Sequence, residues 1–204
     1  MTERSFDPFD QPAATWPAED RLAEVAQIDP PHPAVLPAER LVADCRMSQL
    51  RRSGPGGQHR NKVSTAIRWL HIPSGIAAEA SESRDQSRNR DEALRRLRCR
   101  LAIRLRSRRC SPASAAQPVD GSETQLRRLW GERRLRISAR HVDYPAVLAL
   151  VLDDLHLAGG QPSLVGSKWQ ASTTRLVSLV KQETEALIEV NRWRQHHGRG
   201  PLHG

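Results

Sequence analysis

The chain has 204 residues, a net charge of +9, and a composition that is 38% hydrophobic but only 4% aromatic. This length suits one ordinary domain or two small ones, and the core should be lean and aliphatic. No apolar run is long enough for a transmembrane helix, and the first residues, MTERSFDPFD, lack the apolar centre of a secretory signal. We therefore expect a cytoplasmic protein that has no membrane partner.

The positive charge is concentrated in one block. Residues 84–109 carry eleven arginines against three acidic residues, whereas residues 1–43 carry three arginines against eight acidic residues. A focused block of arginine indicates a polyanionic partner, most commonly nucleic acid. Cys45, Cys99 and Cys110 form no Cys-x-x-Cys pair, so neither a disulfide framework nor a zinc site is predicted. We expect no metal and no cofactor.

The first half of the chain mixes turns with short strands. Residues 1–36 are acidic and rich in proline, which predicts a mostly disordered tail. A short helix is expected at 37–44, a strand at 45–50, and a second short helix at 61–67 after a glycine-rich loop. Residues 68–72 and 76–80 flank Pro73-Ser-Gly75, which is the pattern of a β-hairpin.

A long basic helix is predicted at 86–109. Leu94, Leu97, Leu101 and Leu105 recur at spacings of three and four, which places them on one face. Residues 110–122 (CSPASAAQPVDGS) have the composition of a linker. The rest is predicted to be helical, and the segments 163–169 and 172–181 have the spacing of a helix-turn-helix pair, although any small helical bundle fits equally.

The stretch Arg52–Lys62, RSGPGGQHRNK, cannot join an apolar core. Gly56 and Gly57 can take backbone angles that are closed to other residues, and they let the main chain approach a crowded partner. Gln58 has a neutral amide side chain, so it cannot serve as a general base at ordinary pH. A second Gly-Gly-Gln, at 159–161, follows an apolar helix and precedes a proline, which indicates a helix C-terminus and no chemistry.

Residues 44–105 resemble the catalytic domain of class I peptide chain release factors and of the shorter, codon-independent ribosome-rescue peptidyl-tRNA hydrolases. The resemblance rests on Arg52–Lys62, Thr65-Ala66, HIPSGI at 71–76, Arg84, Gln86, Asn89 and the helix around 93–98. It implies a domain that reaches the peptidyl transferase centre of the large-subunit rRNA and hydrolyses the ester of peptidyl-tRNA. We therefore expect an α+β fold, with a short antiparallel sheet and a long basic helix in the GGQ domain, followed by a small all-helical C-terminal domain.

The expected catalytic residues are Gly56, Gly57 and Gln58. The resemblance implies that the Gln58 main-chain amide stabilises the transition state and that its side chain helps to select water as the nucleophile. No Ser-His-Asp set lies near, so the ribosome would supply the rest of the site. Contacts to the RNA backbone are expected from residues around the loop and along the basic helix: Arg51, Arg52, His59, Arg60, Asn61, Lys62, Arg95, Arg96, Arg98, Arg100 and Arg104.

The expected organisation is a tail at 1–36, the GGQ domain at 37–109, a linker at 110–122 and a helical domain at 123–204, acting as a monomer. Reading a stop codon needs a rigid module at a fixed distance from the catalytic tip. Neither an acidic tail nor a helical domain on a loose linker provides one, which favours codon-independent rescue over stop-codon-dependent release. The alternative is a non-catalytic ribosome- or RNA-binding protein that uses the domain for docking, although the intact Gly-Gly-Gln tip argues against it.

Overall fold

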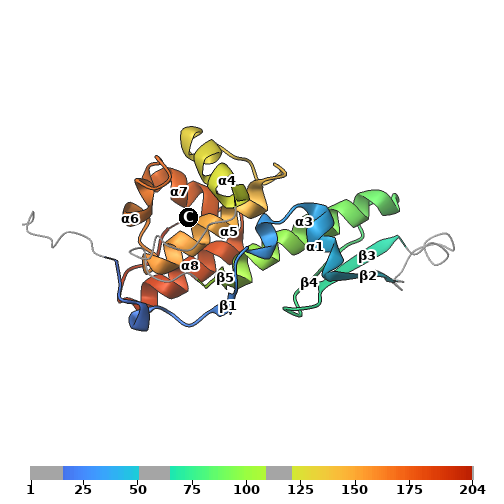
Figure 1. The fold of residues 1–204 in the computed structure, drawn as a ribbon, viewed down its shortest axis with the longest axis horizontal. Coiled ribbons are helices and arrows are strands. Elements are labelled where there is room, and N and C mark those ends of the chain that lie inside the picture. Colours follow the sequence, from blue (N-terminus) through green and yellow to red (C-terminus); the bar gives the residue numbers. More distant parts are fainter. Residues whose placement is uncertain (1–15, 51–64, 109–120, 204) are drawn as a thin grey trace, which may run out of the picture.

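A three-stranded antiparallel sheet lies at one end of the molecule (Figure 1), in a computed structural model that describes residues 16–50, 65–108 and 121–203. Its order is β2 (Cys45–Leu50), β3 (Ala66–His71) and β4 (Ala77–Ala80). Gly75, at φ +69°, closes the turn between β3 and β4, which confirms the predicted hairpin. The short helix expected at 61–67 is wrong for residues 66 and 67, which belong to β3, and residues 61–64 lie outside the described residues.

Helix α3 (Gln86–Arg104) packs across this sheet. It begins where the carboxylate of Asp85 accepts a hydrogen bond of 2.8 Å from the Ser87 backbone N–H, as an N-cap does. Its apolar face, including Leu97 and Leu101, is fully buried. The helix ends at Arg104, five residues before the predicted end, because residues 105–107 form strand β5.

The N-terminal segment follows the core closely. A 3-10 turn, η1 (Glu19–Arg21), precedes strand β1 (Ala26–Ile28), which pairs in parallel with β5 (Leu105–Ser107). A second turn, η2 (Pro33–Val35), and helix α1 (Ala38–Ala43) lead into β2. These elements correct the expectation of a disordered tail for residues 16–36, whereas residues 1–15 lie outside the described part.

Two histidines form hydrogen bonds between this segment and the elements β5 and α5. His32 is fully buried, and its ring accepts the Ala34 N–H at 3.0 Å through Nδ1 and donates from Nε2 to the Leu105 carbonyl at 3.2 Å. Farther along the core, the His156 ring donates to the Ala23 carbonyl at 2.7 Å. The low apolar content of residues 16–36 led to the wrong prediction of disorder. Buried histidine side chains hold this segment by hydrogen bonds, which composition does not reveal.

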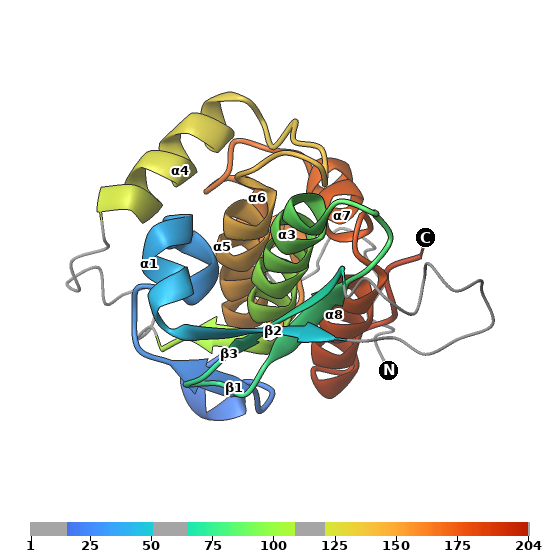
Figure 2. The same ribbon diagram turned by 90° about the vertical axis from the view of Figure 1, so that its right-hand side faces the viewer.

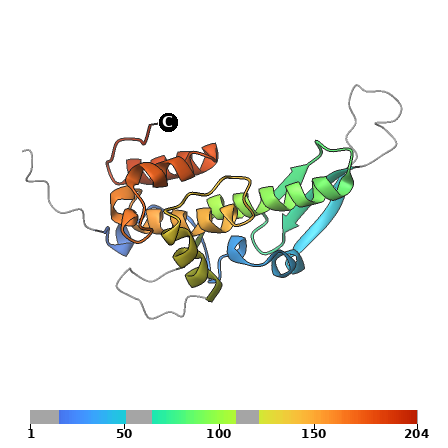
Figure 3. The same ribbon diagram turned by 90° about the horizontal axis from the view of Figure 1, so that it is seen from above.

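Five helices complete the part of the chain that the structure describes: α4 (Gly121–Glu132), α5 (Tyr144–Leu157), α6 (Pro162–Gly166), α7 (Thr173–Val180) and α8 (Thr184–His196). Helix α5 is buried along almost its whole length and lies directly against α3, as Figures 2 and 3 show. The buried side chains of the sheet, α3 and α5 form one continuous apolar core. The C-terminal helices are therefore packed against the GGQ domain and are not loosely connected to it. The sequence-based argument for codon independence assumed a loose connection, and this assumption is wrong.

A buried carboxylate with two cationic partners joins several of the C-terminal helices. The Asp154 carboxylate, with no exposed surface, accepts hydrogen bonds from Arg127 at 2.6 Å, Lys168 at 2.7 Å and the Trp169 indole at 2.7 Å. Burial alone would raise the pKa of Asp154, but the two cations outweigh burial and hold this pKa below its ordinary value. One carboxylate thus ties α4 and the α6–α7 turn to α5. Among the helices of the described residues, none is long and apolar enough to cross a bilayer.

Replacing Asp154 with Ala should lower the free energy of unfolding by about 3 kcal/mol, because the Arg127 guanidinium loses its partner in a largely buried place. Urea titration at pH 7 measures this loss. The pKa of Asp154 is lower in the folded protein than in the unfolded chain. Its carboxylate therefore stabilises the folded state fully when the pH is above the ordinary pKa, and this stabilisation is lost as the pH falls through the folded pKa. The difference in the free energy of unfolding between wild type and variant should therefore become smaller in strong acid. The matched control is Asp91→Ala on the exposed face of α3, and an equal loss in both variants would contradict the assignment.

Candidate functional site

The predicted catalytic residues Gly56, Gly57 and Gln58 lie outside the described residues, as do Arg51, Arg52, His59, Arg60, Asn61 and Lys62. What the structure describes is the pair of strand ends on either side of them. Leu50 at the end of β2 faces Ala66 at the start of β3 in an antiparallel register. The described residues on either side of 51–64 therefore lie next to each other at one end of the sheet, at the end of the long axis where β2 and β3 lie in Figure 1.

Asn89 holds the chain where it re-enters the sheet. Its side chain is 1% exposed, and its amide donates to the carbonyls of Thr65 and Ser83, each at 2.8 Å. Its side-chain oxygen accepts the Ser83 N–H at 2.9 Å. The first turn of α3 is thus bonded directly to the residue that precedes β3. We call this set of three hydrogen bonds the Asn89 clamp.

The clamp has a signal in the sequence that the site prediction missed. Asn89 precedes Ala93, Leu97 and Leu101 at steps of four, so it lies on the buried face of α3. A polar side chain on that face must find partners inside the protein. Its spacing therefore marked Asn89 as an anchoring residue, whereas the prediction used it only as part of a resemblance.

A second contact fixes the same end of the sheet. The Trp69 indole, 3% exposed, donates to the Arg90 carbonyl at 3.2 Å, and the Arg90 guanidinium lies 5.9 Å from the centre of the Trp69 ring. Arg90 is exposed, as are Arg84 and Arg88 on the same end of α3. Arg88 has an ion pair of 3.6 Å with Asp85, yet its side chain stays 81% exposed. Positive charge therefore faces solvent beside this end of the sheet.

The structure gives Arg95 and Arg96 internal partners. Both donate to the Glu92 carboxylate at 2.8–2.9 Å, and Arg96 also reaches Glu82 at 2.9 Å. These hydrogen bonds, that from Arg95 first, hold the pKa of Glu92 below its ordinary value. The face of α3 that looked almost wholly positive in the sequence is thus partly neutralised by its own acidic neighbours.

The other three predicted contacts differ from one another. Arg98 donates to the Ala34 carbonyl at 2.9 Å, and burial lowers its pKa, so it braces the N-terminal segment. Arg100 donates to the Ala77 carbonyl at 2.6 Å, and Arg104 pairs with Glu185 at 3.5 Å. Arg100 and Arg104 are exposed, whereas Arg95, Arg96 and Arg98 are partly buried. Phosphate binding by these five side chains stays a prediction.

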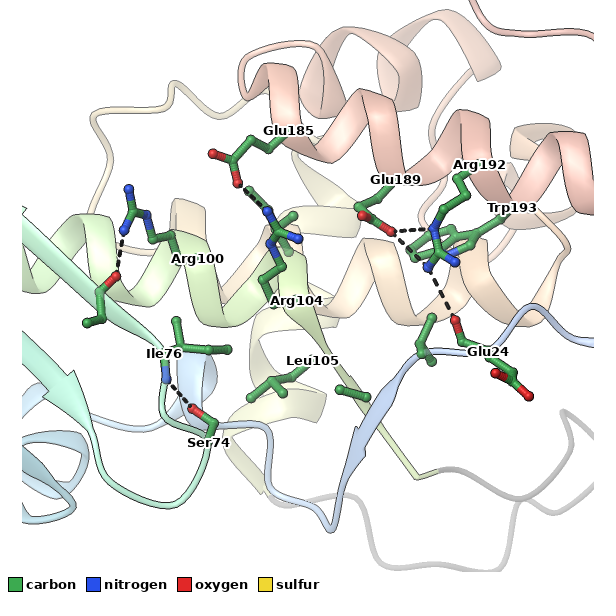
Figure 4. Close-up of a pocket in the computed structure, with 14 residues that line it drawn as sticks. Glu24, Ser74, Ile76, Arg100, Arg104, Leu105, Glu185, Glu189, Arg192 and Trp193 are labelled. Carbon is green, nitrogen blue, oxygen red and sulfur yellow. Dashed lines mark hydrogen bonds and ion pairs between the residues drawn. The ribbon is translucent and has the colours of Figure 1, made fainter.

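Arg100 and Arg104 line a pocket of about 690 Å³ between β4, α3, β1 and α8 (Figure 4). Its described walls carry three arginines and three glutamates, and Arg192 of α8 pairs with Glu189 at 3.0 Å. A balanced lining of this kind does not attract a polyanion. An ion pair spans the pocket, from Arg104 of α3 to Glu185 of α8.

The second Gly-Gly-Gln is a turn, as expected. Gly159 and Gly160 follow α5 with φ of +58° and +72°, a region that favours glycine. Their carbonyls accept hydrogen bonds from Arg199 at 2.7 Å and Arg194 at 2.8 Å. A Cβ on Gly159 would lie 2.6 Å from the Arg199 side chain, so the position is closed to larger residues.

Other reactive groups offer no chemistry in the described residues. Burial raises the pKa of Cys45 to about 11 and that of Cys99 to about 12, so both thiols stay protonated. The described ranges contain no cluster of His, Cys, Asp and Glu side chains that could hold a metal ion.

Asn89→Ala should lower the free energy of unfolding by about 2 kcal/mol, because the Thr65 carbonyl and both backbone groups of Ser83 lose their partner. It should also speed hydrogen exchange at Ala66 and Ile67 more than at Ala78, since the damage is local to the start of β3. Urea unfolding and exchange mass spectrometry measure the two effects. Ser87→Ala, on the exposed side of the same turn, is the control, and uniform exchange throughout the sheet would contradict the clamp.

Comparison of the sequence with known proteins identifies its family. Residues 41–141 match the RF-1 domain. Peptide chain release factor 1 from two strains of Streptococcus thermophilus, ATCC BAA-491 / LMD-9 and ATCC BAA-250 / LMG 18311, is in each case 36% identical over 128 residues, which is 60% of this chain and 34% of the relative. The chain thus spans about a third of the length of these curated relatives. Through this domain, which contains the Gly-Gly-Gln segment between β2 and β3, the chain is a GGQ-domain protein of the class I peptide chain release factor family.

Proposed function

We propose that this protein hydrolyses the ester between a nascent peptide and tRNA on the ribosome, through Gly56, Gly57 and Gln58. The observation that carries the proposal is the RF-1 match over residues 41–141, which includes these three residues. Two curated relatives that match this domain are named peptide chain release factors. The substrate is peptidyl-tRNA, and the partner is the large-subunit rRNA around the peptidyl transferase centre.

The chemistry follows from what the segment can offer. Ester hydrolysis needs a placed water molecule and hydrogen-bond donors aimed at the oxyanion that develops. Gln58 supplies a main-chain N–H and a neutral amide, and its side chain cannot take up a proton at ordinary pH. It therefore orients water and stabilises charge, while the ribosome supplies the remaining groups. The two glycines let the main chain come close to RNA.

The surroundings of the segment support this role. The Asn89 clamp bonds Thr65, the first described residue after 51–64, to α3, so the chain at this point has a fixed position. The exposed side chains of Arg88 and Arg90 lie in the first turns of α3, and Arg84 lies two residues before the helix. We propose that they contact rRNA phosphates when the segment enters the peptidyl transferase centre.

We further propose that release does not depend on the codon in the decoding site. The reason is the single core: η2 packs on α3 and α5, α5 packs on α3, and α4, α6, α7 and α8 pack on α5. The described residues thus contain no module that folds apart from this core, and codon reading needs a rigid module of its own. Ribosomes that have stalled are then the expected substrate.

Gly57→Ala should reduce the rate of peptide release by about 10²–10³-fold, the usual cost of misplacing an oxyanion donor. The added methyl group narrows the backbone angles and removes no charge, so ribosome binding should change little. Release of labelled peptide from purified ribosome complexes measures the rate, and co-sedimentation measures binding. Gly121→Ala, where a Cβ meets open space, is the control. Unchanged release by the Gly57 variant would contradict the catalytic role of Gly56, Gly57 and Gln58. Absence of release by the wild type, with normal ribosome binding, would leave docking as the function.

Codon dependence is tested on two matched complexes that carry the same peptidyl-tRNA, one with a stop codon and one with a sense codon in the decoding site. Equal release rates are expected, because the described residues form one core. A third complex, with an empty decoding site, shows whether absence of mRNA favours release. A large preference for the stop codon would overturn codon independence while leaving the hydrolysis proposal intact.

A further inference from the structure

A groove of about 540 Å³ lies between α6, α7, the end of α8 and the residues that follow it. Its lining is mixed: Pro162, Val177 and Leu202 are apolar, and the polar side chains include four hydroxyls and three cations. These are Ser163, Thr173, Thr174, Ser178, Lys181, Arg194 and Arg199. Its described lining contains no carboxylate. In Figure 1, α6 and α7 lie at the opposite end of the long axis from β2 and β3, so the groove is separate from the edge of the sheet that carries the Gly-Gly-Gln segment.

One wall of the groove is a polar stripe on α7. Thr174, Ser178 and Lys181 follow one another at steps of four and three, which places them on one face of the helix, and all three are exposed. The stripe is about 10 Å long at 1.5 Å per residue, which is longer than a single phosphate group. The opposite face of α7 is buried through Leu176 and Leu179. Helix α7 is therefore fixed to the core, and it presents hydroxyls and the Lys181 cation to the groove beside the apolar Val177.

The other wall holds two arginines that carry unpaired charge. Arg194 donates to the Gly160 carbonyl at 2.8 Å and the Gly200 carbonyl at 2.7 Å, and Arg199 donates to the Gly159 carbonyl at 2.7 Å. These partners are neutral, and neither guanidinium has an ion pair within the described residues. Burial and the nearby Arg199 charge lower the pKa of Arg194. Carbonyl groups hold these two partly buried cations next to each other. An anion bound at the solvent-facing side of the pair would offset the repulsion between them.

We propose that this groove binds the phosphate backbone of RNA. Hydroxyls, lysine and arginine are the side chains that contact phosphates and sugars without reading bases. The arginine pair on one wall and Lys181 on the other suit more than one phosphate along a strand, whereas a phosphopeptide offers one. The proposal goes beyond hydrolysis by Gly56, Gly57 and Gln58 and does not depend on it. It gives the molecule two RNA contacts, one at each end.

The test uses the full chain and a short, fluorescein-labelled, single-stranded RNA, with binding followed by fluorescence anisotropy over a range of salt concentrations. Lys181→Gln should weaken binding and reduce the slope of log affinity against log salt by about 0.7, the value for one phosphate contact on a single strand. Ser178→Asp places a negative charge in the stripe and should weaken binding by about tenfold or more. The control is Arg140→Gln, which removes one charge from an exposed side chain outside the groove.

Equal affinities and salt slopes for the Lys181 and Arg140 variants would overturn the proposal, because net charge alone would then explain binding. Both groove side chains are exposed, so the thermal unfolding midpoint should not move, and this check excludes misfolding as the cause. A labelled phosphoserine peptide is the second probe. If the peptide binds more tightly than RNA and inorganic phosphate displaces it, the occupant is a phosphopeptide and the RNA proposal fails. Ribosomes are absent from these measurements, so their outcome is independent of peptide release.

Discussion

The contact between α3 and α5 is the interaction on which the other elements depend. Leu97 and Leu101 of α3 are buried in a core that α5 shares along almost its whole length. The antiparallel sheet packs on α3, and the parallel pair β1–β5 follows directly from its C-terminal end. Apolar burial of this kind is non-directional, so polar contacts must set how each neighbour is placed. The Asn89 clamp does this for the sheet, and His32 does it for the N-terminal segment.

Arginine has two distinct uses in this protein. Arg106 is fully buried, pairs with Asp153 at 3.2 Å and lies 5.4 Å from the centre of the Trp193 ring, so its planar group acts as a piece of the core. Arg98 similarly caps carbonyls of the N-terminal segment. Arg84 and Arg88 instead face solvent. A count of arginines along α3 could not separate these uses, because the difference lies in which carbonyl or carboxylate each side chain meets.

The sequence predicted the elements whose signal is local. The hairpin of β3 and β4, helix α3 and the helices after it follow from turn residues and apolar spacing, and the Gly-Gly-Gln segment was recognised from its neighbours. The paths of residues 16–36 and 105–107 were not predictable in this way, since β1 and β5 are three residues long and meet across about eighty positions. The partners of Arg98 and Arg104 were missed for the same reason: Arg98 meets Ala34 and Arg104 meets Glu185, which are distant in sequence. Glu92, the partner of Arg95 and Arg96, lies only three and four residues away and could have been found from helical spacing.

The Asn89 clamp lies at one end of a helix that runs unbroken for 19 residues. At 1.5 Å per residue this helix is about 28 Å long. Its far half is embedded against α5, while its near end is bonded to the start of β3. About half of this length, roughly 14 Å, extends beyond that packing, so a tilt of the helix by about 5° would move the clamped end by about 1 Å. The position of the chain at Thr65 thus depends on how α3 packs against α5, away from the sheet.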